Sequence, residues 1–369
     1  MKSEGELAKT WKSRAETEIW QRRKKSGSSW QTPPVTSPLS LMSSKGKEPA
    51  RTPIAPLPNP ATGSANPAAS LSSLWAYITP ALNHIVKSST NNTTKAPAIE
   101  VDFYAGVHSA CYNYITSQTE TYNASSRHDV PMSGTDLYDQ LDKYFADASR
   151  ELLLGAPQED SDLIHYIIPC FNRYSLGAQS ANRLLNYVNR HYVKRAVDED
   201  KGWLTVSDVL EHVAKTAKAT DTREQLGKKL REKRTDELRK WGDIDAGPEA
   251  LVEAEGCAEA ASPVDRIVHI SALAHRRFRV EFIEPLLAVP KLKKGTKVKK
   301  KIPKSNGAGP SPAPKGRLAR AVKNLLESSE IEVEEQAKLA SELAKMLRKI
   351  GVRPDHPLRK KLAKTSAPY

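Results

Sequence analysis

The stretch LLNYVNRHYVKRAVDED (residues 184–200) combines an apolar stripe with a charged end. Its apolar residues recur at intervals of three and four, which is the spacing of one face of an α-helix. They are Leu184, Leu185, Val188 and Tyr192. The pattern predicts an amphipathic helix whose apolar face packs against other helices. The charged end raises the question of whether it is only solvated or also binds a partner.

The C-terminal end of this predicted helix is mainly cationic and aromatic. Its residues include Asn189, Arg190, His191, Tyr192, Lys194 and Arg195. Cations are favoured at the negative pole of the helix dipole, so a solvated helix end accounts for them. Hydrogen bonds inside a bundle are a second account of Asn189, Arg190 and His191. A surface for a partner is the third.

The composition restricts the class of protein and its partners. The hydrophobic fraction of 38% is below the ~45–50% of ordinary soluble domains, so part of the 369-residue chain is expected outside the core. The formal charge of +14 favours nucleic acid, acidic partners or nuclear import. No run approaches the ~18 apolar residues of a membrane helix, and no signal-peptide core occurs, so we expect no membrane partner.

Two segments have a composition that is typical of unpacked chain. Residues 1–69 are rich in Pro, Ser, Ala and Thr and predict a disordered tail. Residues 290–315 predict a linker, with eight lysines and no acid between Pro290 and Lys304. These lysines indicate either a soluble spacer or a nuclear-import signal, and import predicts a protein of nucleus and cytoplasm. The import candidates are Lys293, Lys294, Lys299, Lys300 and Lys301.

Between these segments, apolar residues at helical spacing predict five helices and hence an all-α helical bundle. The helices are expected within 71–87, 98–117, 134–155, 161–175 and 184–200. We expect Pro80 and Pro169 to bend the first and fourth helices. Thr135 is the expected N-cap of the third helix, and Gly155 its stop.

The remaining chain is more charged, and it also reads as helical. Further helices are expected within 202–218 and 222–241, the second of them solvated. Residues 262–289 predict one long helix that stops near Pro285, with a strand at RFRVEFI (277–283) as the alternative. The predicted domains are a tail at 1–69, a five-helix bundle at 70–216, a charged helical region at 217–289, a linker at 290–315, and a C-terminal helical hairpin with its tail at 316–369. We expect a fragment of residues 71–216 to fold alone.

Motifs of catalysis or metal binding are not found in the sequence. It contains no GxGxxG, GxxxxGK[ST], HExxH or GxSxG motif, and its nine histidines are scattered. Cys111, Cys170 and Cys257 are far apart and form no metal or disulfide pattern. His108 and Cys111 are three residues apart, but helix packing explains this pair better than a site. We therefore expect no enzyme, no cofactor and no metal.

Three stretches of the predicted bundle resemble the N-terminal repeat of the cullin family. YAGVHSACYNYITS (104–117) resembles its second helix, which ends Tyr-Asn-Tyr-Cys-Thr-Ser, with Ile115 in place of the Cys. GTDLYDQLDKYFADASREL (134–152) resembles the third, Gly-x-x-Leu-Tyr-x-x-Leu. The stretch at 184–200 resembles the fifth, Tyr-Leu-Asn-Arg-His-Trp-Val, with Tyr192 in place of the Trp. The resemblance covers residues 71–216, and no C-terminal cullin region is recognised.

The resemblance implies a non-enzymatic scaffold of ubiquitin-dependent protein degradation. Its repeat would bind a ubiquitin-ligase adaptor, Skp-like or BTB-type, through the second and fifth helices. The candidate partner-binding residues at matching positions are Tyr104, Val107, His108, Asn189, Arg190, His191 and Tyr192. Ala105 and Gly106 stand where the family has longer side chains. The alternative function is a basic nuclear protein that binds nucleic acid through Lys/Arg-rich segments, although no aromatic residue lies among the linker lysines to stack on bases.

Overall fold

The computed structural model describes residues 66–87, 94–124, 132–216, 221–289, 316–328 and 332–365. All of them belong to one compact unit of the chain. Every regular element in the described ranges is helical, which confirms the predicted all-α class. The predicted tail up to residue 65 and the predicted linker at 290–315, with its five import candidates, lie outside them.

The first three helices follow the predicted periodicity. α2 (Leu71–Leu82) begins after the N-cap Ser70, contains Pro80, and continues as a π-turn at Asn83–Lys87. α3 spans Val101–Ala124, and α4 spans Thr135–Leu154 and ends at Gly155 as expected. Thr135 is not the N-cap of α4, so that prediction is wrong by one residue: Gly134 takes the position with a φ of 91°. This left-handed conformation favours glycine.

The predicted fourth and fifth helices form one nearly continuous helical run. α5 (Leu163–Leu184) contains Pro169 and extends well past the expected end at residue 175. After an irregular Leu185, the chain continues as α6 (Asn186–Val188), a π-turn at Asn189–Val193 and α7 (Lys194–Asp198). Gly177 allows the π-turn that follows α2 to approach α5, because a Cβ at Gly177 would lie 2.5 Å from the Ile85 carbonyl oxygen.

The next helices form a small second core. α8 (Val206–Thr216) packs on α9 (Arg223–Arg239), and α9 on α10 (Pro248–Ala261). As predicted, α9 is highly charged and mostly solvated; its buried residue Leu238 and the following Trp241 pack on small residues of α10. No helix was predicted over α10, because its alanine-rich sequence has few large apolar residues from which to read a period.

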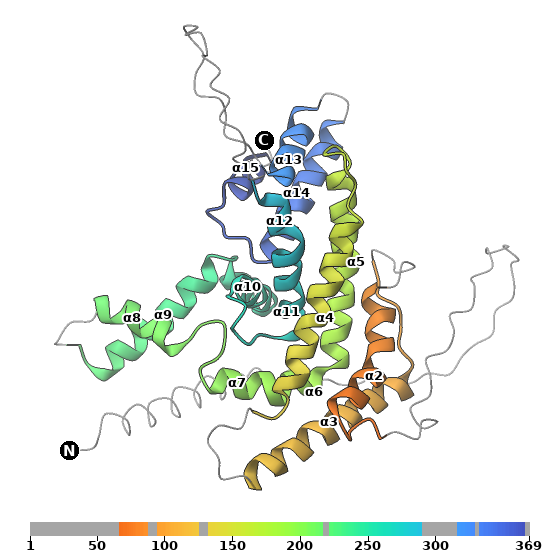
Figure 1. Cartoon of the computed structure of the whole chain (residues 1–369). Helices are drawn as coiled ribbons and strands as arrows, with labels where there is room; N and C mark the ends of the chain where they lie inside the picture. The colour runs from red at the N-terminus through yellow and green to blue at the C-terminus, as the bar shows by residue number, and fades with distance from the viewer. Residues whose placement is uncertain are drawn as a thin grey trace, which may run out of the picture. The chain divides into compact units, whose positions relative to one another are not determined.

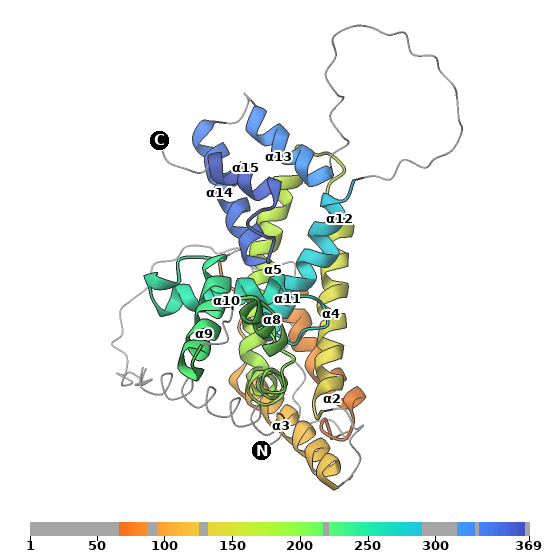
Figure 2. The ribbon, with the colours of Figure 1, turned by 90° about the vertical axis from the view of Figure 1, so that its left-hand side faces the viewer.

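A long helical run then enters the main core. It consists of α11 (Ile270–Phe278), a π-turn at Arg279–Ile283 and α12 (Glu284–Leu287), so a strand at 277–283 is wrong. The predicted long helix is present in part, because it begins at Ile270 instead of residue 262 and passes Pro285 before it ends at Leu287. α11 packs against both α4 and α5, and the run lies alongside them in Figures 1 and 2. The Phe278 ring lies 5.2 Å from that of Tyr174, whose hydroxyl donates to the Ala274 carbonyl oxygen.

The C-terminal helices pack on the same core. α13 (Arg317–Glu327) contacts α5 and α12, whereas α14 (Val333–Lys349) contacts α5, α10 and α15 (Pro357–Thr365). Arg317 and Arg320 both pair with Asp160 in the loop before α5. Within the described ranges, none of the helices has the length and apolar content needed to cross a bilayer.

Candidate partner-binding surface

Tyr104 is a half-exposed aromatic residue held in a fixed orientation on α3. Its side chain is 39% exposed, and its hydroxyl donates to the Arg183 carbonyl oxygen at the end of α5 over 2.7 Å. The hydrogen bond joins two helices, α3 and α5, while part of the ring stays in solvent. An aromatic side chain that is anchored at one edge is a typical anchor of protein interfaces.

Four aromatic rings meet where α3 lies against α6 and the following π-turn. Tyr187 stacks on His191 with 4.0 Å between ring centroids, while His108 and Tyr112 each meet the Tyr187 ring edge-on at 5.5 Å. We call these four residues the ring cluster. Tyr187 is buried, whereas Tyr112 is 49% exposed and both histidines are exposed. The ring cluster is therefore an apolar ridge with polar tips on the surface.

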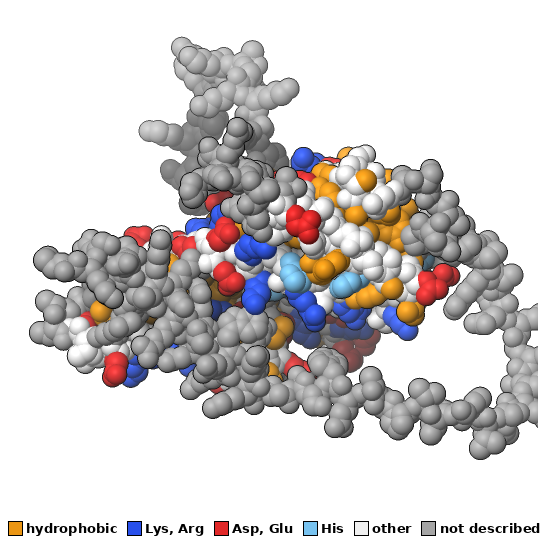
Figure 3. Space-filling view, turned by 90° about the horizontal axis from the view of Figure 1, so that it is seen from below, with side chains coloured by type: hydrophobic (Ala, Val, Ile, Leu, Met, Phe, Trp, Pro, Cys, Tyr) orange, Lys and Arg blue, Asp and Glu red, His pale blue; other side chains and the backbone are white. Residues whose placement is uncertain are grey.

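Cationic side chains surround the ring cluster. Burial lowers the pKa of the His191 imidazole, and nearby positive charges lower it further. In descending order these charges are Arg195, Arg190, Lys194 and His108. Figure 3, which looks onto the end of the molecule where α3 and α6 lie, shows blue cationic side chains beside pale-blue histidines. This face is thus both aromatic and positively charged.

Three of the seven predicted partner-binding residues point into the bundle. Val107, Asn189 and Tyr192 are 0%, 6% and 4% exposed. The Tyr192 ring packs 5.1 Å from that of Tyr138 on α4. The structure brings the other four, Tyr104, His108, Arg190 and His191, onto exposed positions of α3 and the π-turn. A partner on this face would touch these four and not the three buried side chains.

Asn189 instead caps another helix from inside the bundle. Its Oδ1 accepts the Ile270 N–H at 3.1 Å, and its Nδ2 donates to Asn182 Oδ1 at 2.9 Å. Asn182 Oδ1 also accepts the Ser271 N–H at 3.2 Å. Both N–H groups belong to the first turn of α11, which has no partners of its own for them. The sequence left three accounts of Asn189: a solvated helix end, a hydrogen bond inside the bundle, and a partner surface. The structure supports the hydrogen bond inside the bundle.

Replacement of Asn189 by Ala should lower the free energy of unfolding by about 1–2 kcal/mol, because a buried backbone N–H loses its acceptor. Chemical denaturation of the purified protein would measure this. Arg190→Ala is the matched control, since the neighbouring side chain is exposed and its loss should change stability by less than about 0.5 kcal/mol. Equal effects of the two changes would contradict the capping role.

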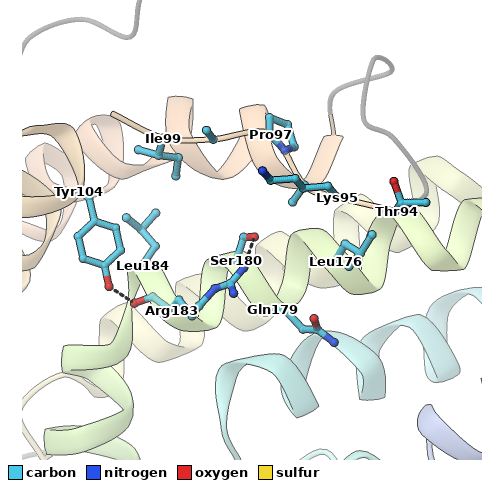
Figure 4. Close-up of a pocket in the computed structure, with 12 residues that line it drawn as sticks. Thr94, Lys95, Pro97, Ile99, Tyr104, Leu176, Gln179, Ser180, Arg183 and Leu184 are labelled. Carbon is cyan, nitrogen blue, oxygen red and sulfur yellow. Dashed lines mark hydrogen bonds between the residues drawn. The ribbon is translucent and has the colours of Figure 1, made fainter. Parts of the chain in front are cut away.

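A pocket of about 530 Å³ adjoins Tyr104 (Figure 4). Residues 94–99 form one wall, and α5 forms the other with Leu176, Gln179, Ser180, Arg183 and Leu184. Arg183 and Lys95 supply positive charge, while Pro97, Ile99 and Leu184 supply apolar surface. The pocket extends the aromatic and cationic face beyond the ring cluster.

Sequence reasoning missed Tyr112 and Tyr187 as members of the ring cluster. Each lies four residues from a predicted site histidine, Tyr112 after His108 and Tyr187 before His191. Residues four apart lie on the same side of a helix, so this spacing was the signal that could have found them. Among the described residues, no group of His, Cys, Asp and Glu could hold a metal ion.

Comparison with known proteins supports part of the resemblance. No family model matches the chain, and no solved structure matches it. The chain is similar to Cell division control protein 53 of Saccharomyces cerevisiae, a cullin, with 22% identity over 141 residues. These residues cover 36% of this chain and 17% of the yeast protein. About a third of the chain is therefore similar to a small part of a cullin.

Proposed function

We propose that the face formed by α3, α6 and the π-turn at Asn189–Val193 binds a ubiquitin-ligase adaptor protein, Skp-like or BTB-type. The protein would then act as a non-enzymatic, cullin-like scaffold in ubiquitin-dependent protein degradation. The observation that carries the proposal is the ring cluster, which joins the two segments that resemble the second and fifth cullin helices. The similarity to the yeast cullin supports the choice of partner class.

The face has the composition of an interface. Its exposed residues include tyrosines and an arginine, which are types enriched in protein–protein contacts. Tyr104 is fixed by its hydrogen bond and the ring cluster by stacking, so few side chains lose freedom on binding. A preorganised aromatic face can supply affinity even though it lacks the longer side chains that the family has at Ala105 and Gly106.

Replacement of Tyr104 by Ala should weaken adaptor binding by about 1–3 kcal/mol, or about 5- to 150-fold in affinity. Because the ring is partly in solvent, the melting temperature should change little. Titration calorimetry of the full chain against adaptors of both types would measure the loss. Tyr104→Phe is the control, since it keeps the ring and removes only the hydroxyl. Unchanged affinity of the Ala variant would exclude Tyr104 from the contact.

Nucleic acid is the second candidate partner, and the observation that favours it is the cationic charge beside the exposed rings. Binding to phosphates weakens steeply with salt, whereas an apolar helix face is less sensitive. A single-stranded oligonucleotide titrated at about 50 mM and about 300 mM salt separates the two candidates. A strong complex that disappears at the higher salt would favour nucleic acid.

We also propose nuclear accumulation driven by the lysine-rich segment between Pro290 and Lys304. Replacement of Lys299, Lys300 and Lys301 by Ala should shift a fluorescent fusion from nucleus to cytoplasm. The matched control replaces three exposed lysines of α15, Lys360, Lys361 and Lys364. A fusion that is cytoplasmic from the start, or that responds equally to both changes, would refute import through this segment.

A further inference from the structure

Three arginines on or beside the proposed docking face lack carboxylate partners among the described residues. Among the described residues, Arg183, Arg190 and Arg195 form no ion pair. Arg183 donates only to Ser180 Oγ, and Arg195 to Ser133 Oγ. Elsewhere on the surface, Arg150 contacts both Asp147 and Glu281, whereas the exposed Arg231 also has no ion pair among the described residues. The positive charge of these three arginines is thus not compensated by an ion pair within the described residues.

Acids lie at both ends of this face, and Asp136 on α4 contacts α3 through Tyr114 and Gln118. Glu100 and Asp102 stand at the start of α3, and the other group, Asp198 to Asp200, begins at the last residue of α7. In the second group, Glu199 pairs with Lys201, and Asp200 accepts the Val206 N–H. Between these ends, the charges that act on His191 are all positive. The side chain of His191, at the centre of the face, therefore lies in a positive electrostatic environment.

The positive charge continues into the pocket beside Tyr104. Arg183 lies on its α5 wall and Lys95 on the opposite wall, as Figure 4 shows. The lining also includes apolar side chains of Ile99 and Leu184, which lie toward Tyr104 in Figure 4. Such a site suits a segment that presents both an apolar side chain and carboxylates. A purely apolar segment would leave the cations without partners and desolvate them at a loss.

We propose that the adaptor docks through an acidic segment, with carboxylates facing Arg183 and Arg190 and an apolar side chain beside Tyr104. This inference rests on the proposed function and deepens it by naming the chemistry of the partner. Exposed charge pairs act mainly on the rate of association, through attraction before contact. The aromatic residues then hold the complex once it has formed.

The test uses surface plasmon resonance with the full chain and the Skp-like and BTB-type adaptors. The double charge reversal Arg183→Glu with Arg190→Glu should slow association about tenfold at low ionic strength, with little change in the dissociation rate. At about 500 mM salt, where charges are screened, the unchanged chain and the double variant should associate with the adaptor at similar rates. The matched control is Arg231→Glu on α9, an exposed arginine without an ion pair among the described residues.

Each outcome separates this inference from the proposed function. If an adaptor binds and the double reversal leaves association unchanged, the acidic segment is refuted and adaptor binding stands. If no adaptor binds, the proposed function fails, and poly-L-glutamate becomes the probe: binding lost in the double reversal but kept in Arg231→Glu supports acidic recognition. If the double reversal and Arg231→Glu both still bind poly-L-glutamate, acidic recognition by Arg183 and Arg190 is refuted. A last outcome favours nucleic acid. If neither an adaptor nor poly-L-glutamate binds, but the unchanged protein binds a single-stranded oligonucleotide and the double reversal does not, the acidic segment is refuted.

Discussion

A fragment of residues 66–216 is expected to lose the cooperative unfolding transition of the full chain. It ends before α11 and the π-turn at Arg279–Ile283, which bury Leu273, Phe278 and Phe282 completely in the main core. Each of these side chains contributes about 1.5–3 kcal/mol by leaving water, and a domain is stable by only about 5–15 kcal/mol. Losing them removes most of that margin. The truncation also removes the N–H groups that Asn182 and Asn189 bind.

Circular dichroism during heating measures the transition. The control is a fragment of residues 66–365, which keeps every described helix and should melt as cooperatively as the full chain. The sequence alone predicted that residues 71–216 fold independently, and the packing of α11 on α4 and α5 reverses that expectation. A 66–216 fragment that melts sharply near the temperature of the full chain would show that α11 is dispensable.

Acidification should destabilise the protein through His275, which is buried on α11. Its Nε2 is hydrogen-bonded to Ser175 Oγ at 3.0 Å, and burial, together with the charge of Lys349, lowers its pKa to about 3. In the unfolded chain a histidine has a pKa of about 6.5. The unfolded state therefore binds a proton as pH falls below about 6.5, while the folded state does not. Stability is full above that pH and is lost progressively toward pH 3.

Between pH 7 and pH 4 this linkage amounts to about 3 kcal/mol. Denaturant titrations across that range measure it, and His275→Gln removes the titrating group while keeping a polar side chain. The variant should be less stable at pH 7 but should lose about 3 kcal/mol less than the unchanged protein on acidification. Parallel curves for both proteins would show that His275 takes up its proton in the folded state.

Sequence patterns predicted the helices that bury large apolar side chains. α4 is an example, because its stripe includes Leu137, Leu141 and Tyr144, and Gly155 ends it. The sequence pattern did not predict the second half of α5, because that half packs through small residues, including Gly177, Ala178 and Ala181. These give little periodic signal, although they allow the closest helix contacts. The alanine-rich α10 was missed for the same reason.

The candidate site was predictable only in part, because of the π-turn at Asn189–Val193. A π-turn has i to i+5 hydrogen bonds and shifts the register of the side chains that follow. The adjacent Tyr192 and Val193 are consequently both buried, and Asn189 turns inward, while Arg190 and His191 stay outside. The regular spacing of the apolar stripe already placed Tyr192 inward, whereas the polar Asn189 gives no apolar signal of its burial. Asn189 also binds backbone that lies 81 residues away, a contact that local sequence does not reveal.

The central claim, that the ring cluster is a docking face, is tested most directly by calorimetric titration of adaptors into the double variant Tyr112→Ala with His191→Ala. These side chains are exposed and in the ring cluster, so their loss should remove stacked surface while leaving the fold intact. Leu154→Ala, which truncates an apolar side chain 87% exposed at the end of α4, is the control. We predict that the full chain and the control bind a Skp-like or BTB-type adaptor with equal affinity, and that the double variant binds at least about tenfold more weakly. Equal affinity of all three proteins, or no adaptor bound by the unchanged chain, would contradict the claim.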